Sequence, residues 1–125
     1  MSRPRILIVD DEQHIVSLLS MTLRKQGYEI LSANNGAKAL ELAGAFELDL
    51  VILDHSMPGM NGVDLSDQLS ASLPVLMVTA RPQILNDKNH RIAEVIHKPF
   101  SPRDLAARVC DMIGPGSPPK KEQSA

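Results

Sequence analysis

Three short runs of almost purely apolar residues constrain the fold of this chain most strongly: 6–9, 50–53 and 75–79. A strand with one face in water alternates apolar and polar residues, whereas a strand that is apolar throughout is buried on both faces of a parallel sheet. Two further β-type runs occur at 29–33 and 94–97. Helical patterns separate the five runs, which predicts an α/β domain with right-handed crossovers.

Helix signals fill the intervals between these runs. Gly27 supplies a stop for the first predicted helix. Ser101 and Pro102 begin the last one, as N-cap and first helical residue. The segment 81–92 holds few apolar residues and predicts a fourth helix that is short or irregular. The apolar positions that predict the first, second, third and last helices lie within 15–23, 37–43, 65–69 and 105–113, respectively.

The length and composition of the chain indicate one domain over residues 1–113. Residues 114–125 are rich in Gly, Pro and Lys, which predicts a flexible tail or the beginning of a linker. A net charge of −2 and an aromatic content of 2% argue against nucleic-acid binding. We expect a cytoplasmic chain without membrane contact, because it shows neither a signal-peptide pattern nor an apolar run long enough for a bilayer.

The single cysteine, Cys110, excludes an internal disulfide and fits a reducing compartment. Its position in the last predicted helix suggests the apolar side of that helix. We therefore expect Cys110 to be a small core residue.

Polar side chains follow the predicted strands: Asp10 and Asp11, Asp54, Thr79 and Lys98. Ligands of doubly wound sheets bind outside the carboxyl ends of the strands. Two carboxylates about 4 Å apart repel by roughly 4 kcal/mol at an effective dielectric of 20. A divalent cation with oxygen ligands, such as Mg²⁺, relieves this repulsion. A carboxylate, a metal ion, an ammonium and a hydroxyl are the parts that phosphoryl transfer to an aspartate requires.

Each of these residues also has a simpler interpretation. Asp10 and Asp11 can cap the first helix, since carboxylates favour helix N-termini. Asp54 can be a turn residue, and Lys98 a solvated side chain. His55 invites a catalytic interpretation but is more simply a partly exposed loop residue. The combination of the residues, at successive strand ends, favours a site.

The ordered set of motifs resembles the receiver domain of response regulators. The strings are Ile6-Leu-Ile-Val-Asp10-Asp11-Glu12, residues 49–62 around Asp54, Val75-Leu-Met-Val-Thr79-Ala80 and Lys98-Pro99-Phe100. The resemblance covers about residues 4–113. It implies a flavodoxin-like, doubly wound (βα)5 three-layer sandwich, with a five-stranded parallel sheet in the order 2-1-3-4-5.

The resemblance also implies the chemistry. Asp54 accepts a phosphoryl group from the phosphohistidine of a sensor histidine kinase or a histidine phosphotransfer protein. Thr79, the amide of Ala80 and Lys98 hold the phosphoryl oxygens, and the Lys98–Pro99 peptide is cis. The implied ligands of Mg²⁺, for which Mn²⁺ can substitute, are Asp11, Asp54, the backbone carbonyl of Ser56 and, indirectly, Asp10.

The implied function is that of a signalling switch in a two-component phosphorelay, a monomer or weak dimer that acts on an unidentified downstream protein. Such a domain catalyses only its own phosphorylation and dephosphorylation and is not otherwise an enzyme. Ser56 and Arg81 occupy positions that tune the lifetime of the phosphoryl group in the family. A metal-dependent phosphatase is the weaker alternative, because only His55 is available as its general acid–base group.

Two departures from the family pattern leave a second function open. Val95 stands where family members usually have Tyr or Phe, and 19 positions separate Thr79 from Lys98, a few fewer than usual. Both affect the surface through which family members commonly signal. The alternative is a constitutive protein-interaction module that retains the acidic pocket.

Overall fold

A computed structural model of the chain describes residues 3–57, 60–61, 65, 67–69, 72–80 and 94–116. The fourth predicted helix, over 81–92, lies outside the described residues. The third, over 65–69, lies only partly within them, and its two predicted core residues, Leu65 and Leu69, are both buried.

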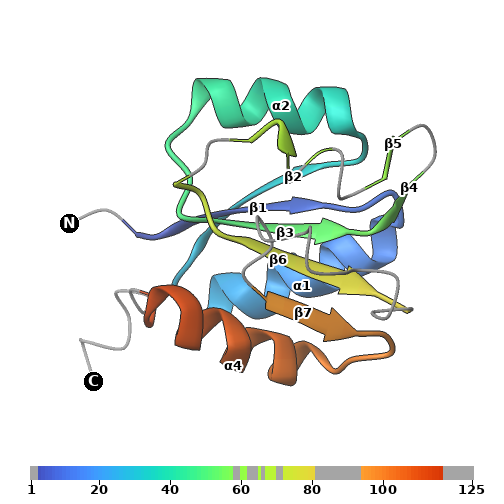
Figure 1. Ribbon diagram of the computed structural model, residues 1–125. Helices are drawn as coiled ribbons and strands as arrows, with labels where there is room; N and C mark the ends of the chain where they lie inside the picture. Colours follow the sequence, from blue (N-terminus) through green and yellow to red (C-terminus); the bar gives the residue numbers. More distant parts are fainter. Residues whose placement is uncertain are drawn as a thin grey trace, which may run out of the picture.

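Five parallel strands form the central sheet, and all five β-type runs of the sequence are confirmed. Their order in space is β2-β1-β3-β6-β7, which is 2-1-3-4-5 in chain order, as predicted. The arrowheads point to one edge of the sheet, away from the two chain ends (Figure 1). The strands are β1 (Arg5–Val9), β2 (Glu29–Ala33), β3 (Leu50–Asp54), β6 (Val75–Thr79) and β7 (Glu94–His97).

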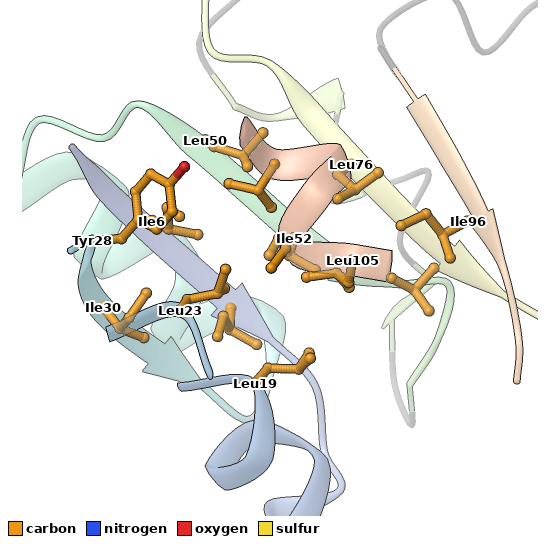
Figure 2. Close-up of a cluster of buried hydrophobic side chains, with 14 of the residues drawn as sticks. Ile6, Leu19, Leu23, Tyr28, Ile30, Leu50, Ile52, Leu76, Ile96 and Leu105 are labelled. Atoms are coloured by element: carbon orange, nitrogen blue, oxygen red, sulfur yellow. The ribbon is translucent and has the colours of Figure 1, made fainter. Parts of the chain in front are cut away.

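The apolar runs are explained by burial of both faces of the sheet. In β1, Ile6 and Ile8 belong to one hydrophobic cluster, and Leu7 and Val9 belong to a second cluster on the opposite face. Figure 2 shows the first cluster, in which side chains from the strands meet those of two helices. Because successive strand residues point to opposite faces, a doubly covered strand has no position for a polar side chain.

Within the described part of the chain, three helices cover the sheet: α1 (Gln13–Lys25), α2 (Gly36–Ala45) and α4 (Pro102–Ile113). Helix α2 lies on one face, and α1 and α4 lie on the other, which makes a three-layer sandwich (Figure 1). Two N-caps fix where helices begin: Asn35 accepts from the amide of Lys38 at 2.8 Å, and Ser101 from that of Asp104 at 3.0 Å.

The prediction that Cys110 is a core residue is wrong, because its side chain is exposed. The buried side chains of α4 are Leu105, Ala106 and Val109. Cys110 follows Val109 by one residue, which turns it about 100° around the helix and into solvent.

A small antiparallel pair of strands, β4 (Ser56–Met57) and β5 (Met60–Asn61), follows β3 and was not predicted. No described helix has the length and apolar character required to cross a lipid bilayer.

Replacing Leu105 by alanine is expected to destabilise the domain by about 2–5 kcal/mol, because it leaves a cavity where α4 packs on the sheet. Urea denaturation measures the difference. The matched control is Leu18→Ala in α1, whose side chain is 44% exposed and should cost well under that amount. Equal losses for the two variants would contradict the described packing of α4.

Candidate functional site

Four side chains gather at the carboxyl edge of the sheet, where the strand order reverses. The register pairs Val9 with Leu53, so that Asp10, which follows β1, lies level with Asp54. In doubly wound sheets this switch point is the usual place for a ligand. The four are Asp10 after β1, Asp54 at the end of β3, Thr79 at the end of β6 and Lys98 after β7.

Three carboxylates form the core of the site. Asp10, Asp11 and Asp54 each offer one carboxylate oxygen, and these oxygens all lie within 4.8 Å of one another. Asp10 and Asp54 are 5% and 4% exposed, whereas Asp11 faces solvent. Hard anionic oxygens at this spacing are the donor set that suits Mg²⁺, so the residues fit the metal that the sequence predicts.

Lys98 supplies positive charge to the cluster. Its Nζ lies 3.0 Å from Oδ1 of Asp54, and the lysine side chain is 28% exposed. Its backbone amide donates to the carbonyl oxygen of Thr79 at 2.7 Å, which ties the end of β7 to the end of β6. The Lys98–Pro99 peptide is cis, as predicted.

The carboxylate of Asp10 is held at the beginning of α1. Its Oδ1 accepts a hydrogen bond from the amide of Glu12 at 2.9 Å, and Glu12 is the N-cap residue of the helix. Capping of α1 is therefore not the whole role of Asp10, because the same carboxylate also lies close to those of Asp11 and Asp54.

Burial and charge shift the pKa values at the site. Burial raises the pKa of Asp10 to about 6; the charge of Asp54 adds to the rise, and the amide of Glu12 and the ammonium of Lys98 oppose it. Burial on its own lowers the pKa of Lys98, but the hydrogen bond and charge of Asp54 outweigh it, so that this pKa is raised. Lys98 thus keeps its positive charge beside Asp54. Asp10 loses its proton at a higher pH than an ordinary aspartate does.

The remaining predicted site residues follow or end the same strands of the sheet. Thr79 is buried, and Ala80 follows it at the exposed end of β6. Ser56 begins β4, two residues after Asp54. His55 is half-buried, as expected, and its amide donates to the carbonyl of Val78 at 2.9 Å. Arg81 lies outside the described residues.

Two features of the site were missed by sequence reasoning. The bond from the Glu12 amide to Asp10 links residues two apart, a turn that Asp forms readily, so the Asp-Asp-Glu string contained a usable signal. The pairing of β4 with β5 was signalled by the Pro58-Gly59 dipeptide, which favours a turn.

Comparisons with known proteins agree with this geometry. The family profile of the response regulator receiver domain matches residues 6–110. The transcriptional regulatory protein YrkP of Bacillus subtilis is 41% identical over 110 residues, which are 84% of this chain and 47% of YrkP. The chain thus spans about half the length of the curated relatives that it matches.

Solved structures share the fold. The response regulator TrrA of Thermotoga maritima, solved in complex with Mg²⁺ and BeF, has a TM-score of 0.80 and 34% identity, and covers 87% of this chain and 98% of its own. TrrA in complex with the histidine kinase ThkA gives 0.78 and 33%, with coverage of 88% and 98%. The chain belongs to the receiver-domain family of two-component response regulators.

Proposed function

We propose that this receiver domain is a phosphorylation-controlled switch in which Asp54 carries the phosphoryl group. The observation that carries the proposal is the carboxylate cluster itself: three acidic oxygens within 4.8 Å of one another, with the ammonium of Lys98 at 3.0 Å from Asp54. Such a concentration of negative charge destabilises a fold unless a cation offsets the repulsion.

Asp54 is the nucleophile. One of its carboxylate oxygens attacks the phosphorus of a phosphohistidine, a bond from that oxygen to phosphorus forms, and the bond from phosphorus to the imidazole nitrogen breaks. The imidazole keeps the electron pair and takes up a proton. Asp54 needs no general base, because an ionised carboxylate is already nucleophilic.

Asp11, Asp54 and the backbone carbonyl of Ser56 are the residues that would hold Mg²⁺ or Mn²⁺, with Asp10 beside them. A bound divalent cation supplies positive charge to the phosphoryl oxygens. The partly exposed Asp11 leaves the cluster open to solvent on one side.

The proposed partners of the phosphoryl oxygens are Lys98, Thr79 and the amide of Ala80. Lys98 exchanges its contact with Asp54 for one with the new phosphoryl group, which preserves a charge-assisted hydrogen bond. The hydroxyl of Thr79 and the amide of Ala80 provide donors next to it, at the end of β6. The phosphoryl group is thus held by groups from two neighbouring strand ends.

The setting follows from the family. The proposed donor is a sensor histidine kinase or a histidine phosphotransfer protein, as a solved complex of TrrA with a kinase supports. The proposed output is binding of a downstream protein by a cytoplasmic domain of residues 1–113, acting as a monomer or weak dimer without nucleic-acid or membrane contact. Residues 114–125 continue the chain beyond it.

Val95 favours a second candidate, the constitutive interaction module. It lies in β7 and packs, half-buried, against the cluster on the α2 face. A valine there offers no large side chain that swings between exposed and buried positions. Equal affinity for the downstream partner with and without the phosphoryl mimic would favour this candidate over the switch.

Beryllofluoride with Mg²⁺ should bind to the wild-type domain and not to Asp54→Asn, because the mimic requires a carboxylate oxygen. Fluorine NMR detects the bound fluorides, and ¹⁵N spectra of the protein report the residues affected. Asp111→Asn is the matched control, since Asp111 is exposed on α4. Binding to Asp54→Asn as strong as to the wild type would overturn the assignment of the phosphoacceptor.

Asp10→Asn should stabilise the metal-free domain at pH 7.5. The pKa of Asp10 is raised to about 6 in the folded state from 3.8, so the folded state retains a proton that the unfolded state loses. Stability is therefore lost as the pH rises through this interval, and the ionised carboxylate costs on the order of 1–3 kcal/mol above it. An asparagine removes this cost and keeps an acceptor for the Glu12 amide.

Urea denaturation in EDTA measures the gain, which should shrink as the pH falls from 7.5 toward 4. Added Mg²⁺ should stabilise the wild type more than the variant. Asp111→Asn should change stability by no more than about 0.5 kcal/mol. A metal-free Asp10→Asn variant that is less stable than the wild type at pH 7.5 would refute the charge crowding inferred for the site.

A further inference from the structure

We propose that residues 114–116 form a latch that fixes the path by which the chain leaves α4, holding it against the turn between α1 and β2. The segment belongs to the region that composition predicts as a flexible tail or linker. The latch goes beyond the proposed function and does not depend on phosphorylation.

The phenol of Tyr28 is the fixed point of the latch. Tyr28 directly precedes β2, is 2% exposed and belongs to the same hydrophobic cluster as Ile6 and Leu23 (Figure 2). Its hydroxyl donates to the carbonyl oxygen of Gly114 at 2.6 Å, and the backbone of Gly116 lies close enough to lower the pKa of the phenol. Burial and the neighbouring Cys110 outweigh this effect and raise the pKa of Tyr28, so the hydroxyl is a neutral donor at physiological pH, as in an ordinary tyrosine.

Gly116 lies directly against the backbone of the turn. A Cβ atom at this position would lie 2.5 Å from the carbonyl oxygen of Gln26 and 2.6 Å from the carbonyl carbon of Gly27. Both atoms belong to the backbone, so no flexible side chain can move aside. Position 116 therefore accepts glycine and excludes any residue with a side chain. A loose tail would impose no such restriction.

The turn that receives Gly116 is itself tied to the last turn of α1. The amide of Gly27 donates to Arg24 at 3.0 Å, and the amide of Tyr28 donates to Leu23 at 3.2 Å. Gly27 has φ of 98°, a conformation that favours glycine. The latch therefore fixes residues 114–116 relative to α1.

This exit lies at the edge of the sheet opposite the acidic cluster. Tyr28 precedes the first residue of β2, whereas Asp10 and Asp11 follow β1 and Asp54 is the last residue of β3. The latch thus fixes residues 114–116 on the side of the domain away from the acidic cluster.

Amide hydrogen exchange of the full 125-residue chain, followed by ¹⁵N NMR, tests the latch. The Gly116 amide should exchange at least about tenfold more slowly than the same sequence in an unfolded peptide, because the backbone of the turn and the phenol of Tyr28 shield it from water. Tyr28→Phe keeps the buried ring and removes the hydroxyl, so it should abolish this protection while amides in β1 and β3 stay protected. Exchange of Gly116 at the unfolded rate in the wild type would overturn the proposal.

Two glycine substitutions distinguish the close contact at Gly116 from general effects of an added methyl group on the fold. Gly116→Ala should release the segment, with loss of protection at residue 116 and a rise in backbone mobility there. Gly44→Ala is the control, because its added Cβ would meet nothing within 4 Å, and it should leave the Gly116 amide unchanged. Protection at residue 116 that survives both Tyr28→Phe and Gly116→Ala would contradict the latch.

Discussion

Three carboxylates crowded at one edge of a parallel sheet are the constraint on which the rest of this structure depends. Asp10 and Asp54 are buried, and Asp11 lies within the same 4.8 Å cluster. Like charges at such distances repel by several kcal/mol unless a cation intervenes. Lys98 supplies one positive charge, which leaves the cluster net negative. Burial raises the pKa of Asp10, and the charge of Asp54 adds to the rise. The site therefore has the negative charge and the oxygen donors of a cation site, as the proposed phosphorylation of Asp54 requires.

The repulsion between the carboxylates is opposed by the packing of the apolar strands that carry them. The strands that end in the site are buried on both faces, so their carboxyl ends cannot shift without breaking two hydrophobic clusters. The register between β1 and β3 places Asp10 level with Asp54, and the bond from Lys98 to Thr79 joins the ends of β6 and β7. Sheet topology thereby brings residues far apart in sequence to one point.

Much of this was predictable from sequence, and the failures have physical causes. The strands were found because double burial demands uninterrupted apolar residues, as at 6–9. Cys110 was misplaced because one residue of helical rotation separates core from solvent. The pKa of Asp10 depends on burial and on neighbours that only the folded structure supplies. The close contact of Gly116 with the turn at Gln26 and Gly27 was not predicted, because a backbone contact between residues far apart in the chain leaves no local sequence pattern.

The most direct test of the central claim is the intact mass of the domain after incubation with a phosphohistidine donor and Mg²⁺. We expect the mass to increase by one phosphoryl group, and we expect no increase when EDTA is present during the incubation. Borohydride reduction of the acyl phosphate followed by peptide mapping should place the modification on Asp54. A domain that gains no mass under excess donor, or that carries the group on another residue, would contradict the account.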